Sequence, residues 1–419
     1  MRAKLIPDHV PIVRKNGISA TYNLINFVNG MIGPGCFSVA MAFKQGGLWT
    51  SFFLVFFIGT VSTISMHKIV RCSQLLARIL GDQSLDYGEM AAAAFRNSFP
   101  AIHKYGKAAQ FFVNGCLIFF QVGVASILAY FDVDNPFSDK VMLLLYGVPA
   151  TVINMLKDIR AVTFTCLVGN IFIFAAIGLI LEELMTSKHI WQELPWITSF
   201  DSVVMCAGSL LYSFEGQAMV LPLENKLKHP RDMNGWTGVL TTGMAFVTII
   251  YTYCGFYGYI TYGNAVDGSI TLNLPDNTVN IVVKILLVFV VFFGNVLQIY
   301  VIAEMIWPPV KKRLEKGETS KFLAVDRRLR GSIDMLGLAV AVPNLQQIIP
   351  FIGITAGMLL SLIIPAVLDV VVFLPPKLAD GESKLRISLF LAEDVFLFVV
   401  GLFFLVSGLQ SNVKSMMHS

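Results

Sequence analysis

The sequence predicts an all-α integral membrane protein with about eleven transmembrane helices. Of its 419 residues, 55% are hydrophobic and only 14% are charged, whereas about a quarter of the residues of a soluble domain carry charge. Apolar runs long enough to cross the roughly 30 Å hydrocarbon core of a bilayer recur along the chain. Two of these runs are interrupted near their centres by glycine, together with proline or glutamate. We therefore expect the helices to lie in a lipid bilayer. We expect the binding site at the two interruptions.

Seven predicted spans are uninterrupted: they cover residues 48–72, 108–130, 161–184, 237–262, 281–306, 349–374 and 387–409. Four more are irregular: they cover residues 19–45, 141–156, 202–222 and 332–345. The transmembrane domain is thus expected over residues 19–410, between an N-terminal tail of residues 1–18 and a short C-terminal tail of residues 411–419.

Basic residues predict the orientation in the membrane. Residues 1–18 lack the apolar core and the small-residue cleavage site of a secretory signal, so they are expected in the cytoplasm. With eleven spans, the loops on that side hold every lysine and arginine except Lys44, Lys140, Lys188, Lys284 and Lys414. This excess follows the positive-inside rule. The net charge of +4 then reflects loops beneath a membrane, and no nucleic-acid partner is expected.

Two further features concern the loops and the cysteines. The segment LDYGEMAAAAFRNSF, within the predicted inner loop 73–107, can form an amphipathic helix on the membrane surface. All six cysteines fall in or at the ends of predicted helices, with spacings that fit no metal site. We expect packing thiols, with no disulfide framework, metal or cofactor.

The first interruption reads GMIGPGC, at residues 30–36. Pro34 has no N–H group, and its ring clashes with the carbonyl of Gly30 four residues back. It also disfavours helical geometry at Gly33, and Gly33 and Gly35 can adopt backbone angles that other residues avoid. The pattern predicts that one helix ends near Gly30 and that another begins at Pro34, a favourable first residue. A simple proline kink is the alternative.

The second interruption lies in SLLYSFEGQAMVLPLENK, which places Glu215 and Gly216 near the centre of a span. A carboxylate there costs at least about 2.5–3.5 kcal/mol unless it is protonated, paired or hydrated. The interruptions fall in the first and the sixth predicted spans, so each opens a group of five. This layout indicates a transporter with a 5+5 inverted repeat plus one extra helix, and with a binding site near the middle of the membrane.

The sequence around Glu215 resembles the amino acid/auxin permease family, in particular its proton-coupled amino acid transporter branch. The resemblance is collinear over about residues 18–410 and is carried by FEGQAMVLPLENKLKHP, GMIGPG, MHKIVRCS, GSITLNLP and QIYVIAEMIWP. It implies the broken-helix fold of amino acid–polyamine–organocation transporters. It also implies secondary active transport of small neutral amino acids by alternating access, and no enzymatic reaction.

The resemblance also implies how the substrate binds. The substrate carboxylate would meet the N–H groups of Gly35, Cys36 and Phe37, and its ammonium would meet carbonyls near Tyr212 and Phe214. Physical chemistry agrees, because a helix N-terminus favours anions and a C-terminus favours cations. The chain departs from the family pattern at Pro34, where Thr or Ser is usual. The expected substrate-binding residues are Gly30, Ile32, Gly33, Gly35, Cys36, Phe37, Tyr212, Phe214 and Gly216.

The sequence leaves the coupling ion open. Glu215 is the candidate proton carrier, although a structural pairing with a nearby donor is an equal alternative. Asn26 and Asn29 share one helix face and resemble an asparagine pair of sodium-coupled members of the wider family. They can instead bond to neighbouring helices. The coupled ion is thus H⁺, Na⁺ or none. Three more acids in predicted spans, Asp369, Glu393 and Asp394, have no evident partner.

Other classes of function fit less well. An intramembrane enzyme would need a catalytic motif at depth, such as His-Glu-x-x-His or paired aspartates in a Gly-x-Gly-Asp setting, and neither motif occurs. A channel would favour one short filter loop over two interrupted helices. An amino-acid sensor on the same fold is the remaining alternative, because sensing and transport can share a site. We expect a multi-pass monomer in the plasma membrane or in a lysosomal or endosomal membrane.

Overall fold

The computed structural model describes residues 13–14, 17–81, 84–130, 159–275, 277–287, 289–290 and 345–418. Within these ranges the chain is helical, and its one extended pairing is an isolated bridge between Ile18 and Leu227. The α-helices are α1 (Ala20–Met31), α2 (Pro34–Gly46), α3 (Leu48–Ile79), α4 (Tyr87–Arg96), α5 (Gly106–Tyr130), α7 (Ile159–Thr186), α8 (Phe200–Ser213), α9 (Gln217–Lys226), α10 (Val239–Tyr262), α13 (Leu345–Ile352), α14 (Ile364–Ala379) and α15 (Lys384–His418).

Shorter elements join these helices. Single turns of 3₁₀-helix are η1 (Pro100–Tyr105), η2 (Trp191–Glu193), η3 (Pro230–Met233), η4 (Gly263–Ala265) and η5 (Ile270–Leu272). Two stretches of wider π-helix, Gly353–Gly357 and Leu359–Ile363, connect α13 to α14. A further apolar helix covers Thr278–Leu287.

Within the described part, five helical segments are long and apolar enough to cross a membrane. They are Leu48–Ile79, Phe200–Lys226, Val239–Ala265, Ile348–Ala379 and Lys384–Lys414, and the bent pair α1 and α2 makes a sixth. The predicted spans at 141–156 and 332–345, and most of the one at 281–306, lie outside the described residues. The count of eleven and the inverted repeat therefore stay predictions.

Both predicted interruptions are present. α1 ends at Met31 and α2 begins at Pro34, with a bend of 53° between them. α8 ends at Ser213 and α9 begins at Gln217, so the backbone leaves helical geometry around Glu215. The interruption at Pro34 follows from its missing N–H and its ring, and the residue fills the first position of the new helix. A simple kink is thus wrong for this site.

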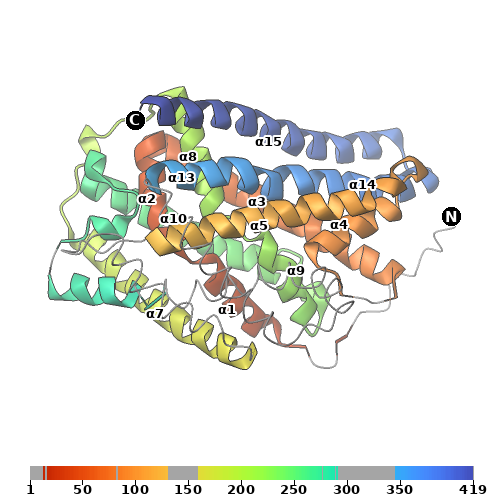
Figure 1. Cartoon of the computed structure of the whole chain (residues 1–419), viewed down its shortest axis with the longest axis horizontal. Helices are drawn as coiled ribbons and strands as arrows, with labels where there is room; N and C mark the ends of the chain where they lie inside the picture. Colours follow the sequence, from red (N-terminus) through yellow and green to blue (C-terminus); the bar gives the residue numbers. More distant parts are fainter. Residues whose placement is uncertain are drawn as a thin grey trace, which may run out of the picture.

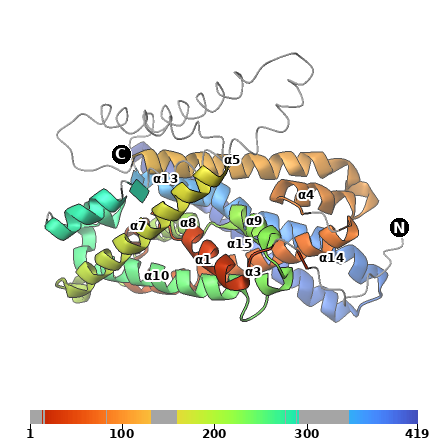
Figure 2. The ribbon, with the colours of Figure 1, turned by 90° about the horizontal axis from the view of Figure 1, so that it is seen from below.

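The helices pack as a bundle in which burial separates inner from outer spans. α8 lies between α5 and α10 in Figure 2, and the span Phe200–Lys226 has 72% of its apolar window buried. α15 runs along one edge of the bundle in Figure 1, and only 17% of its window is buried. Its exposed side chains include Leu389, Phe396 and Phe403. α15 therefore presents an apolar face that suits lipid.

The two ends of the described chain lie at opposite ends of one span. The Ile18 N–H donates to the Lys226 carbonyl at 2.9 Å, next to the end of α9. Near the other end of the chain, Lys414 Nζ lies 2.9 Å from Asp201 Oδ2, at the start of α8. Asp201 and Lys226 lie at the two ends of the interrupted span Phe200–Lys226. A helix of its 27 residues is about 40 Å long. This agrees with an odd number of crossings.

The segment around residues 87–96 forms the predicted helix, and its apolar side packs against other helices of the protein. In α4, Tyr87, Met90 and four successive alanines are buried, because the helix packs against α5, α3 and α14. The Asp86 side chain caps the N-terminus of α4 by accepting a hydrogen bond from the Glu89 N–H. The Glu89 carboxylate in turn accepts one from the Asp86 N–H. The apolar side of this helix thus completes the protein core.

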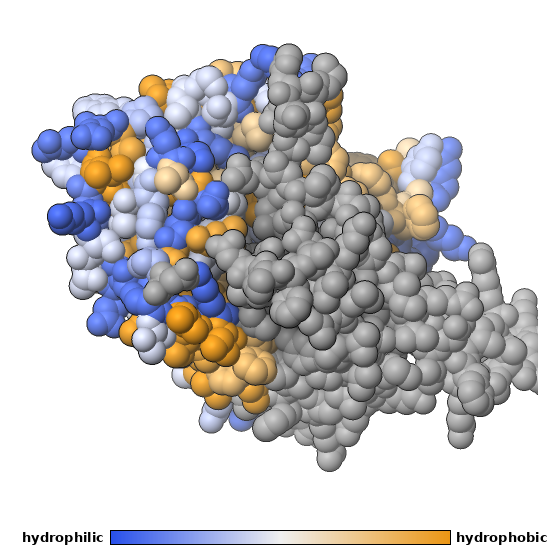
Figure 3. Space-filling model, turned by 60° about the vertical axis from the view of Figure 1, so that its left-hand side comes forward, coloured by the Kyte–Doolittle hydropathy of each residue, from blue (hydrophilic) through white to orange (hydrophobic). Residues whose placement is uncertain are grey.

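Figure 3, which brings one end of the bundle forward, shows hydrophilic residues gathered on that end.

Candidate functional site

The two interruptions meet at the hydroxyl of Tyr251 in α10. The Tyr251 hydroxyl lies 2.6 Å from the Met31 carbonyl and 3.0 Å from the Ser213 carbonyl. These carbonyls belong to the last residues of α1 and α8, where helices leave carbonyls without intrahelical partners. Tyr251 is fully buried, and its ring contacts Phe214 with centroids 5.0 Å apart. One side chain thus positions the ends of both interrupted helices.

A second contact joins α2 directly to α8. The Gly35 carbonyl accepts hydrogen bonds from the hydroxyls of Ser38 and Ser213, each at 2.9 Å. A Cβ atom at Gly35 would lie 2.8 Å from Ser213 Cα, so the two helices touch there through backbone. Glycine at this position is required by close approach.

The structure corrects the backbone argument for the glycines of the first interruption. Gly33 has φ −142° and ψ −155°, an extended geometry open to any residue, and Gly35 is part of α2. Neither has a positive φ. Among the described residues, a Cβ atom at Gly33 would meet nothing within 4 Å, whereas one at Gly30 would meet the Met219 side chain. Open space therefore lies beside Gly33.

The helix termini leave a donor and two acceptors available. Of the predicted donors, the Cys36 N–H is bonded to the Gly33 carbonyl at 3.0 Å, but the Gly35 N–H has no hydrogen-bond partner within the described part. The carbonyls of Tyr212 and Phe214 likewise accept no hydrogen bond from the described residues. A donor at the start of α2 and acceptors at the end of α8 suit a carboxylate and an ammonium, respectively.

The side chains of the other predicted residues are packed around the two interruptions. Ile32, Phe37, Tyr212 and Phe214 are buried, and the Tyr212 ring lies 5.8 Å from that of Phe120 in α5. Cys36 is buried with its Sγ 3.5 Å from Cys254 Sγ in α10. At the second interruption, a Cβ atom on Gly216 would meet Met31 Sδ and Met66 Cε. These residues pack the interruptions together, and the contact with the substrate itself stays a prediction.

Glu215 sits at the second interruption and is bound by neutral groups. The Ser361 hydroxyl donates to Glu215 Oε2 at 2.5 Å, and the Gln217 N–H donates to Oε1 at 3.1 Å. Among the described residues, no lysine, arginine or histidine nitrogen is recorded in an ion pair with this carboxyl. Both partners can bind either the charged or the protonated carboxyl, so the structure permits a change of charge here.

Tyr87 approaches the same region from α4. Its hydroxyl donates to the Leu360 carbonyl at 3.3 Å, next to Ser361. Burial, with the charge of a Glu215 carboxylate as a smaller cause, raises the pKa of Tyr87 well above its ordinary value. The Tyr87 hydroxyl therefore remains a neutral donor.

Within the described residues, Asn26 and Asn29 show no bond to a neighbouring helix, which was one alternative for them. Asn26 is exposed, and neither Asn26 nor Asn29 makes a side-chain hydrogen bond that is recorded in the described part. Asn29 Oδ1 is buried without a partner. The buried amide of Asn23 lies 3.7 Å from Met233 Sδ.

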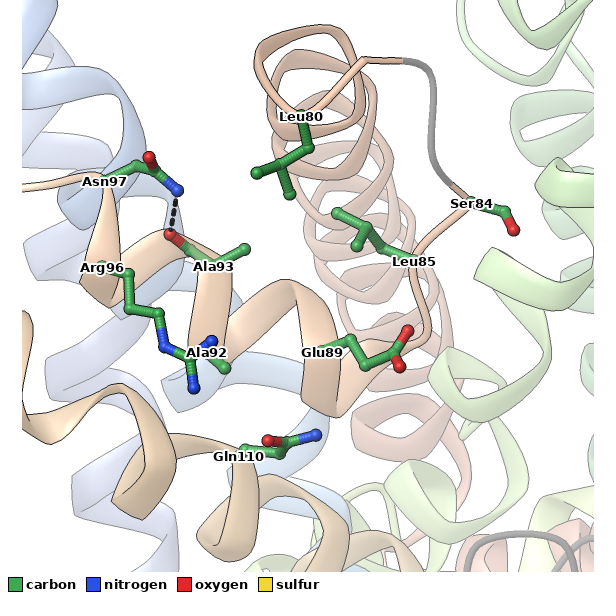
Figure 4. A pocket seen from close by; sticks show the side chains of 9 residues that line it. All are labelled: Leu80, Ser84, Leu85, Glu89, Ala92, Ala93, Arg96, Asn97 and Gln110. Carbon is green, nitrogen blue, oxygen red and sulfur yellow. Dashed lines mark hydrogen bonds between the residues drawn. The ribbon is translucent and has the colours of Figure 1, made fainter. Parts of the chain in front are cut away.

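A surface cavity of about 640 Å³ lies away from both interruptions. Figure 4 shows its lining residues, which come from the end of α3, the segment that leads into α4, α4 itself and the first turns of α5. It is lined by Leu80, Ser84, Leu85, Glu89, Ala92, Ala93, Arg96, Asn97 and Gln110. None of the predicted binding residues lines it.

Sequence reasoning missed the residues that hold the site together. Tyr251 stands in a run with four other tyrosines, so no local pattern singles it out. Ser38, Ser213 and Ser361 are small hydroxyl residues in apolar helices. Their roles become evident only from their hydrogen-bond partners in the structure. Ser213 precedes the interruption by two residues, and that proximity is the one signal that could have found it.

Comparison with known proteins gives a consistent result. A family described as "Transmembrane amino acid transporter protein" matches residues 16–412. The chain is similar to the probable amino acid transporter skat-1 of Caenorhabditis elegans, with 29% identity over 420 residues, covering 96% of this chain and 91% of that protein. It is also similar to the proton-coupled amino acid transporter-like protein pathetic of Drosophila melanogaster, with 27% identity over 410 residues, covering 93% and 84%.

Proposed function

Because this chain belongs to the amino acid/auxin permease family of transmembrane amino acid transporter proteins, we propose that it moves small neutral amino acids across a membrane by alternating access, coupled to protons. The family and both relatives carry the names of transporters, not of enzymes. The chain is accordingly a membrane transporter-family protein, as the sequence predicted. Substrate size, ion coupling and mechanism are the proposed parts.

One observation carries the choice of site: the two interruptions are held against each other, with complementary helix ends beside open space. The Gly35 N–H at the start of α2 would bind the substrate carboxylate, because the helix dipole adds to its donor strength. The carbonyls of Tyr212 and Phe214 at the end of α8 would bind the ammonium. The space beside Gly33 would take the substrate side chain.

The lining of the site favours a small neutral side chain. Ile32, Phe37 and Phe214 are apolar, and Glu215 is the charged side chain that the described residues place at either interruption. An acidic substrate side chain would face Glu215 without a cation to balance it. A basic one would consume the carboxyl that we assign to the proton.

Proton coupling is proposed through Glu215. A carboxylate at membrane depth costs about 2.5–3.5 kcal/mol or more when no cation faces it, so a proton is its simplest counter-charge. The Ser361 hydroxyl and the Gln217 N–H hold the carboxyl at the α8–α9 interruption. A protonated Glu215 would let the occupied interruptions change sides without an uncompensated charge on this carboxyl. Substrate and proton would thereby cross together.

Glu215→Gln tests this role, because glutamine imitates the protonated carboxyl. The variant should exchange substrate across the membrane of proteoliposomes, while its net uptake should lose its dependence on pH. Ser361→Ala is the matched variant: it removes one hydrogen bond but keeps the acid, so the pH dependence should persist. An unchanged pH profile in Glu215→Gln would remove Glu215 as the proton carrier.

Sodium coupling is the second candidate, because Asn29 Oδ1 is buried and has no hydrogen-bond partner among the described residues. Amide and carbonyl oxygens suit a hard cation such as Na⁺. Asn26→Ala and Asn29→Ala should then weaken uptake that Na⁺ stimulates and leave proton dependence intact. Uptake that is the same with Na⁺ and with choline would exclude this candidate.

A sensor on the same fold is distinguished by flux. A thermal-shift screen of amino acids at two pH values, with and without Na⁺, would identify the ligand. The same ligand, radiolabelled, is then offered to proteoliposomes. Binding together with uptake supports the transporter, whereas binding without uptake supports the sensor. We place the protein as a monomer in the plasma membrane or a lysosomal or endosomal membrane, with residues 1–18 in the cytoplasm.

A further inference from the structure

A buried ion cluster lies on three helices away from the interruptions. Lys68 of α3 is 1% exposed, and its Nζ lies 3.0 Å from Asp369 Oδ2 of α14. The same Nζ lies 2.9 Å from Asp394 Oδ1 and 3.0 Å from Glu393 Oε1, both on α15. One ammonium therefore binds three carboxyl groups from two other helices.

Asp369 is fully satisfied in this cluster. Arg71 donates to both of its oxygens, at 3.2 Å and 3.0 Å, while its guanidinium lies 5.5 Å from the centroid of the Phe373 ring. Cys72 Sγ lies 3.8 Å from Asp369 Oδ1. Lys68 and Arg71 thus both donate to Asp369.

The charges of the cluster do not balance. Two cations, Lys68 and Arg71, face three acids, Asp369, Glu393 and Asp394. The Glu393 side chain is 53% exposed, whereas those of Asp369 and Asp394 are 0% and 2% exposed. Of the two buried acids, Asp369 binds both cations and Asp394 binds Lys68 alone. The excess negative charge is therefore most costly on Asp394.

Asp394 also has an oxygen with nothing to bind it. Its Oδ1 accepts from Lys68, but its Oδ2 is buried and has no hydrogen-bond partner among the described residues. The groups that face it are Lys68 from α3, Asp369 from α14 and Glu393 on its own helix. A buried carboxylate oxygen without a donor is unfavourable, and a proton on that oxygen removes the charge.

We propose that Asp394 is a second proton-binding site of this protein, separate from Glu215, with the proton on Oδ2. Glu393 and Arg71, each about half exposed, are the members of the cluster that reach the protein surface, and the proton would be exchanged there. Binding changes the charge that holds α15 to α3 through Lys68, so the site couples protonation to the packing of these helices. It does not require that the interruptions bind substrate.

One helix of the cluster, α3, also packs against the second interruption. Ser65 and Ser62 precede Lys68 by three and six residues, which is about 4.5 Å and 9 Å along α3. Both hydroxyls are buried and lack hydrogen-bond partners in the described part. Three residues further, a Cβ atom on Gly59 would contact the Phe214 ring at 3.4 Å. Unsatisfied hydroxyls therefore lie on α3 between Asp394 and the interruption.

Isotope-edited infrared spectroscopy tests the proposal. The full-length protein is made by cell-free synthesis with aspartate carrying ¹³C in its side-chain carboxyl, and reconstituted in lipid at neutral pH. The C=O stretch of a protonated carboxyl should shift with this label, because Asp394 carries a proton, whereas a Glu215 band should not shift. Raising the pH should abolish the shifted band.

Variants assign the band. Asp394→Glu keeps a carboxyl but removes the label, so the shifted band should disappear, as it should in Asp394→Asn. Glu393→Gln is the matched control at the neighbouring, exposed position and should retain it. No label-sensitive band in the wild type, or a band that survives Asp394→Glu and is lost in Asp369→Asn, would overturn the proposal. The wild-type spectrum needs no substitution, so the test stands if a variant fails to fold.

Discussion

Substitutions at Gly33 and Gly35 separate the effects of packing from those of transport at the first interruption. In Gly35→Ala, the new Cβ would lie 2.8 Å from Ser213 Cα and 3.2 Å from Ser213 Cβ, so backbone must move. Such overpacking costs about 1–3 kcal/mol, and the better helix propensity of alanine returns less than about 1 kcal/mol in a first turn. We expect a net loss of about 1–2 kcal/mol of stability. In Gly33→Ala the Cβ meets nothing within 4 Å, and the change in stability should stay within about 0.5 kcal/mol.

The assay compares stability with uptake in the same preparations. Thermal unfolding of purified protein should rank Gly35→Ala below the wild type and Gly33→Ala beside it. Gly33→Leu should also unfold like the wild type, because its side chain enters open space, yet it should abolish uptake by filling the proposed substrate site. Gly35→Leu should lose both. Normal uptake by Gly33→Leu would refute a substrate at this interruption, and an unaltered Gly35→Ala would refute the backbone contact with Ser213.

Three further outcomes follow from the geometry. Tyr251→Phe should lower stability by about 1–3 kcal/mol, since two buried carbonyls lose their donor; Tyr253→Phe, whose ring stacks on Tyr257, is the control, and equal unfolding temperatures would contradict the assignment. Lys68→Met should cost about 3–5 kcal/mol because it strands buried acids, and adding Asp394→Asn should restore part of the loss; a Lys68→Met protein as stable as Arg71→Met would contradict it. Epitope tags at the two termini should be reached from opposite sides of the membrane, and labelling of both on intact cells would contradict an odd number of spans.

Local rules predicted the interruptions, because their causes are local. Pro34 removes an N–H and blocks a helical turn whatever surrounds it, so α1 ends and α2 begins where the sequence indicates. The predicted span 48–72 lies within α3, which continues as helix to Ile79. Lys68 and Arg71, near the end of that span, both bind Asp369.

Tertiary partners could not be predicted from one sequence. Asp394 had no evident partner because Lys68 lies 326 residues away in the chain. The polar sequence around α4 suggested a surface helix, yet its small alanines let it pack closely against α5. Tyr251 and Ser361 serve the interruptions from other helices, and no local spacing records that relation. The sequence thus predicted where the backbone breaks, but not which side chains hold the breaks together.

The central claim is proton-coupled amino acid transport through the paired interruptions, and one flux measurement tests it most directly. Purified protein in proteoliposomes is given radiolabelled alanine in Na⁺-free buffer, with the outside more acidic than the inside. Alanine should accumulate above its external concentration, and collapse of the pH gradient should abolish the accumulation. Glu215→Gln should exchange alanine but not accumulate it. Accumulation by Glu215→Gln equal to that of the wild type, or alanine binding without any flux, would contradict the account.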